Sequence, residues 1–246
     1  MTTPAAFALS ELNKGELIWF DPGVGHALPG EVLEYHKPAQ VLTVQAVIAG
    51  KPQIFSLTSA NGLKRRQDLG QNGIDDMIQL TDLNEASLLW NLKIRYEKEL
   101  IYTYTGSILV AVNPYKMYDM YGLDMVKKYE GQILGTLPPH LFAIGSAAYS
   151  GLSKCNQAVV ISGESGSGKT ESTKLVMQYL AAVNKSPSNL ITEQILEASP
   201  LLESFGNAKT VRNDNSSRFG KYLEVYFKEY VFRCISIFFF FFSFIH

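Results

Sequence analysis

The sequence has little of what disulfide frameworks, metal sites or highly charged partners require. Its 246 residues include only two cysteines and four histidines, scattered along the chain, so neither a disulfide framework nor a metal-ligand cluster can be read from them. The 22 Lys and Arg nearly balance the 23 Asp and Glu, so bulk charge predicts neither nucleic acid nor an acidic membrane as a partner. An anionic ligand must therefore be held by local groups.

Targeting and membrane-spanning signals are also missing. The first residues, MTTPAAFALSELNKGE, show no basic start followed by an apolar run, which argues against a secretory signal. With so few cysteines, we expect a reducing, cytoplasmic location. The uncharged end, Cys234–Ile245, would reach only about 18 Å as a helix against a hydrocarbon core of roughly 30 Å, so we expect no membrane span.

What is present is enough apolar sequence to build a core, since apolar residues make up 46% of the chain and charged residues 18%. After a tail over 1–14, short β-rich runs broken by Gly and Pro, such as Leu28-Pro29-Gly30, fill residues 15–62 and predict a small antiparallel barrel or meander. From residue 75 the apolar spacing becomes helical, and we expect the main domain to begin there. The first helix face would be formed by Leu83, Ala86, Leu89, Trp90 and Tyr96.

Strands and helices alternate in this main domain. The runs Ser107–Val112 and Ala158–Ile161 are apolar on both faces, as in strands covered by helices on each side of a sheet. A helix is expected after Pro139, another after the second run, and a third over Thr192–Phe205 that bends at Pro200. A strand is expected over 222–227. The pattern predicts an α/β fold with a mixed sheet flanked by helices.

One motif carries chemistry, because residues 163–170 match the phosphate-loop pattern of Gly, four residues, Gly, Lys and Ser or Thr. Its glycines let backbone N–H groups point at phosphate oxygens, Lys169 supplies a charge for the β and γ phosphates, and the Thr170 hydroxyl suits Mg²⁺. A chance match would occur in roughly one chain in a hundred, and the strand before and helix after it lower that further. The predicted phosphate-binding residues are Gly163, Glu164, Ser165, Gly166, Ser167, Gly168, Lys169 and Thr170.

A second polar cluster, Asn213–Lys221, would by itself be a solvated loop more often than a site. Together with 163–172, Leu202–Lys209 and Asn113–Lys116, however, it resembles the myosin motor head, with the motifs in the same order. The resemblance covers residues 15 to about 228. Details at Ile101–Gly106 and at 192–198 are most similar to class seven myosins or their relatives in classes ten and fifteen.

The resemblance implies an ATP and Mg²⁺ site, actin filaments as a partner, and a cytoplasmic place in a myosin complex on the actin cytoskeleton. Residues 213–221 would form the first switch loop, and the early β-rich segment would be an SH3-like barrel. Besides Lys169, the implied catalytic residues are Asn213 and Ser216, which would contact the γ-phosphate and the attacking water, and Arg218, which would pair with a glutamate of the second switch. Ser217 would join Thr170 as an Mg²⁺ ligand, while Asn113, Lys116 and Tyr121 would lie along the adenine.

The sequence departs from that family in lacking the second switch and the actin-binding cleft. We therefore expect nucleotide binding, with little hydrolysis and no force. Two other interpretations remain. A different phosphate-loop kinase or GTPase should show a guanine-reading Asn-Lys-any-Asp motif or an arginine-rich lid, and neither is present. An inactive adaptor would use its apolar end to dock a partner or a membrane surface.

That end, residues 229–246, diverges from the family and contains five consecutive phenylalanines, Phe238–Phe242. Phenylalanine codons are pyrimidine-rich, so we expect that this run is not native myosin sequence and comes from reading into an intron. A buried strand is the less favoured alternative, because five consecutive aromatic residues give no polar face to water.

Overall fold

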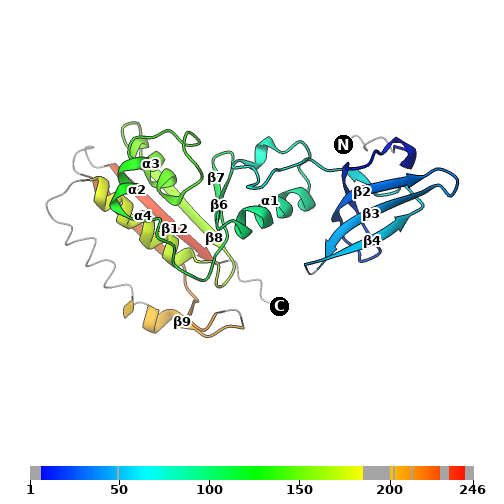
Figure 1. Cartoon of the computed structure of the whole chain (residues 1–246). Helices are drawn as coiled ribbons and strands as arrows, with labels where there is room; N and C mark the ends of the chain where they lie inside the picture. Colours follow the sequence, from blue (N-terminus) through cyan, green and yellow to red (C-terminus); the bar gives the residue numbers. More distant parts are fainter. Residues whose placement is uncertain are drawn as a thin grey trace. The chain divides into compact units, whose positions relative to one another are not determined.

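A computed structural model describes residues 7–48, 50–184, 200–201, 203–211, 213–227 and 233–241, with only the backbone for 239–241. The chain divides into two compact units, Met1–Arg95 and Tyr96–His246, whose elements are labelled in Figure 1. Most of the expected third helix, 192–199, and part of the expected tail, 1–6, lie outside the described residues; helical backbone is described at 200–201 and 203–206.

The first unit contains a five-stranded antiparallel sheet with strand order β4-β3-β2-β1-β5. Alternate strand residues, among them Ile18, Phe20 and Val44, form its core, and the short 3-10 helix η1 (Leu9–Glu11) adds Leu9. The expected antiparallel strands are confirmed. Their bounds are β1 Leu17–Phe20, β2 Leu28–His36, β3 Val41–Ile48, β4 Lys51–Leu57 and β5 Lys64–Arg65.

The break expected at Leu28-Pro29-Gly30 is wrong, since these residues open β2. Gly30 pairs with Ile18 in β1, and a Cβ added to Gly30 would lie 2.5 Å from a methyl group of Val44 and 2.7 Å from the Phe20 ring. The glycine is therefore used for close packing inside a strand and not for a turn.

Helix α1 (Glu85–Glu97) exists as expected, but the face predicted to be buried is wrong. Leu89 is 69% exposed, whereas Ser87, Asn91 and Arg95 are buried. Asn91 accepts from the Ile74 N–H at 2.7 Å and donates to the Ile74 carbonyl at 3.0 Å, and Arg95 pairs with Asp75 at 2.6 Å. Because the loop before the 3-10 helix η2 (Met77–Gln79) offers the Ile74 backbone and the Asp75 carboxylate, the helix buries polar side chains that pair with them.

The second unit contains a three-stranded mixed sheet, with β12 (Arg233–Phe241) between β11 (Lys221–Phe227) and β8 (Gln157–Gly163). β12 runs parallel to β8 and antiparallel to β11. Helices α2 (Leu123–Tyr129), α3 (Leu141–Gly151) and α4 (Lys169–Val183) lie against this sheet in Figure 1 and share one apolar core with it. Helices and a mixed sheet confirm the α/β class at this level.

The apolar runs Ser107–Val112 and Ala158–Ile161 were expected to form strands buried on both faces. Among the described residues, each run has an exposed face. The first run forms β7 (Ile108–Ala111), which pairs with β6 (Tyr102–Thr105) in a separate two-stranded sheet, and Ile108 is 64% exposed. In β8, Val159 is buried and its neighbour Val160 is 62% exposed. The helices described here pack on the Val159 face, so Val160 has no apolar partner layer.

The phenylalanine-rich end forms strand β12 over Arg233–Phe241, while the side chains of 239–242, which the alternative of a buried strand concerns, lie outside the described residues. Within β12, the adjacent residues Cys234 and Ile235 are both buried, although they point to opposite faces, and Ile237 is 1% exposed. Both edges of β12 are hydrogen-bonded, so its backbone polar groups are satisfied within the sheet, while Ser236 and Phe238, on the face opposite Ile235 and Ile237, are half-buried. Residues 228–232 and 242–246 lie outside the described part of the chain.

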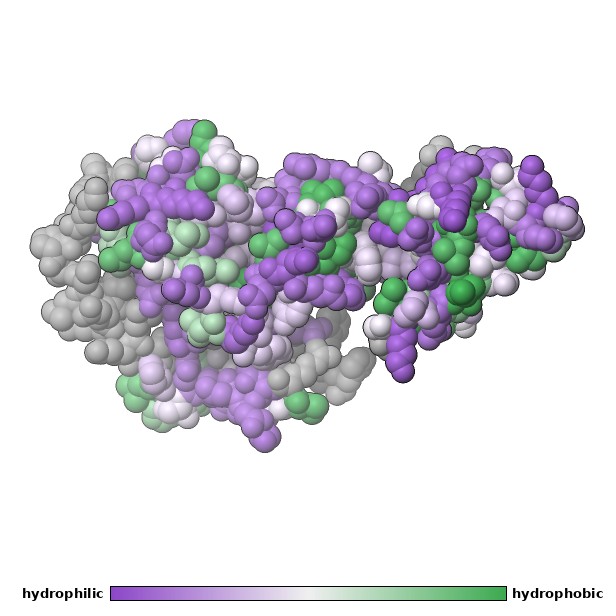
Figure 2. Space-filling model, in the orientation of Figure 1, coloured by the Kyte–Doolittle hydropathy of each residue, from purple (hydrophilic) through white to green (hydrophobic). Residues whose placement is uncertain are grey.

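The cysteines and the lengths of the helices can be stated briefly for the described residues. Cys155 is exposed, Cys234 is buried, and both are free thiols. Among the same residues, none of the helices combines the length and the apolar content needed to cross a membrane. Figure 2 shows hydrophilic side chains spread over much of the visible face, with smaller apolar areas between them.

Candidate functional site

The glycine-rich loop joins the end of β8 to the start of α4, as the sequence predicts. Its three glycines adopt positive φ angles, 156° at Gly163, 80° at Gly166 and 88° at Gly168. A Cβ on Gly163 would lie 2.6 Å from the Ser167 hydroxyl oxygen. The expectation that these positions need glycine is thus confirmed, and the backbone curves where other residues would be strained.

Lys169 lies in the concave side of this loop, with only 6% of its surface exposed. Its ammonium group donates to the carbonyl of Gly163 at 2.8 Å and to that of Glu164 at 2.6 Å. Burial lowers the pKa of Lys169. Gly168, the N-cap of α4, offers no side-chain acceptor to the first helical N–H groups, so the positive end of a 15-residue helix faces the same region.

A second segment is hydrogen-bonded to the loop. The two-residue strands β9 (Asn207–Ala208) and β10 (Ser216–Ser217) pair antiparallel, and both serines are buried. The hydroxyl oxygens of Ser165 and Ser216 are 2.6 Å apart, and those of Thr170 and Ser217 are 3.4 Å apart. The two sequence motifs therefore meet through paired hydroxyl groups.

Thr210 is a part of this junction that sequence reasoning missed. Its hydroxyl lies 3.1 Å from that of Ser165 and also bonds the backbone of Asn213, accepting from the N–H at 3.1 Å and donating to the carbonyl at 3.0 Å. The only signal in the sequence was its place between two motifs. It fixes the turn from which Asn213 projects.

Three cavities adjoin the loop. One, of about 330 Å³, is lined by Ser167 and Lys169 together with apolar residues of β7, α3 and β8. The other two share a wall: the first measures about 220 Å³ and the second about 280 Å³, and both are lined by Asn113, Tyr115, Gly168 and Glu171. The Asn113 amide donates to the Gly166 carbonyl at 2.7 Å, which anchors the shared wall. A ligand could extend from one cavity into the other along these residues.

Most of the predicted site residues line these cavities. In the first cavity they are Asn113, Gly166, Gly168, Lys169, Thr170, Asn213, Ser216 and Ser217. In the second they are Asn113, Lys116, Tyr121, Ser167 and Gly168. Four predicted residues line neither: Gly163, Glu164, Ser165 and Arg218.

The roles of these four differ. Gly163 and Glu164 present carbonyls to Lys169, and Ser165 bonds the second segment. The Arg218 side chain is exposed, and its backbone N–H donates to the Gly206 carbonyl at 2.9 Å. Its pairing with a second switch stays a prediction. Lys116, at the mouth of the second cavity, is held by an ion pair with Glu99 at 2.5 Å.

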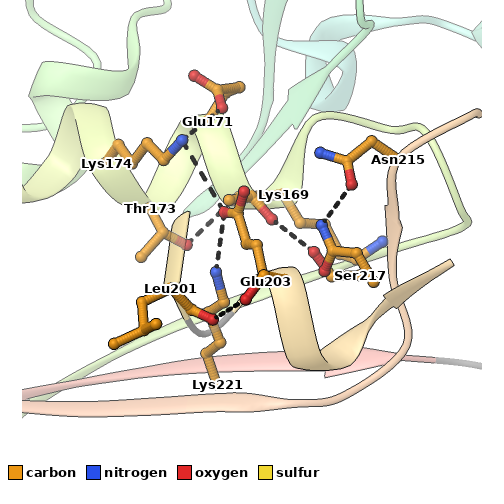
Figure 3. Close-up of polar contacts among 12 residues, drawn as sticks. Lys169, Glu171, Thr173, Lys174, Leu201, Glu203, Asn215, Ser217 and Lys221 are labelled. Carbon is orange, nitrogen blue, oxygen red and sulfur yellow. Dashed lines mark hydrogen bonds and ion pairs between the residues drawn. The ribbon is translucent and has the colours of Figure 1, made fainter. Parts of the chain in front are cut away.

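A carboxylate that sequence reasoning did not single out also lines the first cavity. Glu203 lies 3.2 Å from the ammonium of Lys221 and 4.0 Å from that of Lys174, which also pairs with Glu171 at 3.0 Å (Figure 3). Without these lysines, the Glu203 carboxylate would repel an incoming anion. The network therefore keeps the cavity compatible with a phosphate ligand.

The hydroxyl groups at this junction fit Mg²⁺ that is also bound by a phosphate ligand. Thr170 and Ser217 present two hard oxygen atoms close together, the ligand type that Mg²⁺ prefers. Among the described residues, no cluster of three or more His, Cys, Asp or Glu side chains could hold a metal ion alone. A metal here would need phosphate oxygens and water to complete its shell.

The glycine loop, its buried lysine and the bonded serine segment lie together on a unit built from helices and a mixed sheet, which is the arrangement that the loop motif predicts. Comparison with known proteins is consistent with this prediction, since residues 74–236 match the myosin head (motor domain) family model. The chain therefore belongs to the myosin head family. The match continues past Phe227 into β12.

Individual relatives agree with this assignment. The chain is 54% identical to human unconventional myosin-XV over 176 residues, 48% identical to Drosophila melanogaster myosin-VIIa over 218, and 46% identical to mouse unconventional myosin-VIIb over 225. These alignments cover 71%, 88% and 89% of this chain but only 5%, 10% and 10% of the respective relatives. These similarities are consistent with part of a myosin motor head of class seven or fifteen.

Proposed function

We propose that this chain binds ATP with Mg²⁺ as the nucleotide-binding part of an actin-based motor. The observation that carries the proposal is the first cavity, where the ammonium of Lys169, the start of α4 and the hydroxyls of Thr170 and Ser217 converge. Together these groups supply what a triphosphate needs, namely backbone donors, one mobile positive charge and two oxygen ligands for the metal.

Each residue then has a separate role. Lys169 exchanges its loop carbonyls for β- and γ-phosphate oxygens, and Thr170 and Ser217 hold Mg²⁺, which neutralises charge on the phosphates when bound. Ser216 and Asn213 face the terminal phosphate. The second cavity receives the adenine beside Asn113, Lys116 and Tyr121.

Further parts of the proposal concern the whole protein. The sheet of β1 to β5 acts as an SH3-like barrel, and the parent protein works on actin filaments in the cytoplasm. This chain, without a second switch to orient water, hydrolyses ATP slowly and produces no force. Because it spans 5–10% of the curated relatives compared above, these activities belong to a longer polypeptide.

Titration of a fluorescent ATP analogue tests the binding proposal. Lys169→Ala should weaken binding about tenfold or more, because a charge-assisted contact to phosphate is lost, while the exposed Lys154→Ala serves as a matched control and should bind like wild type. Equal binding by Lys169→Ala and wild type would contradict the phosphate cradle. Absence of binding by wild type would favour the adaptor interpretation.

Sedimentation with actin filaments tests the second part. The chain should stay in the supernatant with and without ATP, since its sequence contains no actin-binding cleft. Strong ATP-sensitive pelleting would show that the described units already carry an actin site.

A further inference from the structure

A buried aromatic cluster lies next to the second cavity, and its central residue is outside both the cavity lining and the family-derived site. Tyr102 and Tyr121 line the cavity, and their hydroxyl oxygens are 2.8 Å apart. His140, only 3% exposed, contacts both rings, with centroid distances of 5.5 Å to Tyr102 and 5.6 Å to Tyr121. The cavity wall is therefore supported by the imidazole.

The two ring nitrogens of His140 have different partners. Nδ1 accepts from the Phe142 N–H at 3.0 Å, which makes His140 the N-cap of α3. The proton of the neutral ring must then lie on Nε2, which donates to the Met120 carbonyl at 3.0 Å. Since Met120 immediately precedes Tyr121, this bond fixes the backbone from which the Tyr121 ring projects.

The imidazole is itself held from other directions. It stacks on Tyr129 at 5.0 Å with an interplanar angle of 22°, and it meets Phe142 edge-on at 4.7 Å. The Tyr129 hydroxyl in turn donates to the Pro138 carbonyl at 2.8 Å. His140 therefore links α2, α3 and the Met120–Tyr121 segment in one rigid arrangement.

We infer that His140 is a positioning residue for the base-binding end of the nucleotide site, holding the Tyr121 and Tyr102 wall against which the adenine packs. The inference rests on the proposed function, because it takes the second cavity as the adenine pocket. On this inference the nucleotide site has two separate ends, one for the base and one for the phosphates. The phosphate end, residues 163–170, has no hydrogen bond or ring contact to His140 among those described, so loss of His140 weakens base recognition and spares phosphate binding.

The test compares the affinity of the full 246-residue chain for ATP and for inorganic pyrophosphate, both with Mg²⁺, by calorimetry. His140→Asn keeps a side-chain oxygen that can cap α3, but it lacks the ring and the reach to Met120. We expect ATP affinity to fall about tenfold and pyrophosphate affinity to stay within about twofold of wild type. The exposed His36→Asn, in the first unit, is the control and should change neither.

Tyr102→Phe provides a second variant that keeps the ring and removes the hydroxyl that contacts Tyr121. It should lower ATP affinity about threefold with pyrophosphate unchanged. Equal weakening of ATP and pyrophosphate, or unchanged ATP affinity in both variants, overturns the role of His140 and leaves the proposed function standing. A wild-type chain that binds neither compound refutes the proposed function itself.

Discussion

The buried imidazole of His140 makes the stability of the second unit depend on pH. Burial lowers its pKa from 6.5 to about 4, mainly by desolvation, with the nearby Lys128 charge acting in the same direction and the bond to Met120 opposing. The unfolded chain therefore binds a proton at a higher pH than the folded chain does. Stability from this group is complete above about pH 6.5 and is lost as the pH falls towards 4.

The size of the effect follows from the two pKa values. With 6.5 for the unfolded chain and about 4 for the folded chain, the loss is about 2 kcal/mol at pH 5 and about 3 kcal/mol at pH 4. Urea unfolding followed by far-UV circular dichroism at several pH values measures it. Carboxyl groups titrate in the same range, so the quantity to compare is the difference between wild type and His140→Gln, which cannot titrate.

Wild type should lose about 2 kcal/mol more than His140→Gln between pH 7 and pH 5. The exposed His36→Gln is the control for replacing an imidazole elsewhere in the chain. Parallel pH dependence of wild type and His140→Gln would refute the reasoning, because it would mean that the ring titrates in the folded chain as it does in water.

Two further predictions concern packing and are measured by urea unfolding. Ile235→Ala should destabilise by about 2–5 kcal/mol because it opens a cavity in the central strand, while the exposed Tyr226→Ala in β11 should cost well under that; equal effects would show that β12 is not packed as described. Gly145→Ala should cost about 1–3 kcal/mol, since its Cβ would lie 2.6 Å from the Tyr179 ring between α3 and α4, and a neutral result would mean that the two helices are further apart.

Local patterns predicted the loop correctly because its geometry is set by adjacent residues. The strand before Gly163 and the helix after it are both found, and the positive φ angles fall on the glycines that the motif provides. The meeting of this loop with Ser216 and Ser217 came from the family resemblance. Nothing in the local spacing indicated it, because those partners lie far away in sequence.

The errors about burial share one physical cause, namely that burial depends on what packs against an element. Leu89 has the spacing of a core position but is exposed. The other side of α1 is buried instead, because Asn91 bonds the Ile74 backbone and Arg95 pairs with Asp75. A buried strand was the less favoured interpretation of the phenylalanine-rich end because five consecutive aromatic residues give no polar face to water. The backbone of 233–241 does form a strand, because β8 and β11 supply hydrogen-bonding partners on both of its edges.

The hydrogen bonds of Lys169 to two loop carbonyls affect which anions can bind at this site. Its ammonium already has two carbonyl acceptors, so an incoming anion competes with them and must offer at least as many well-placed oxygens. Chloride, with a single contact point, gains little from this exchange, whereas a polyphosphate replaces both acceptors and adds further ones. We therefore expect the site to bind polyphosphates in preference to simple anions.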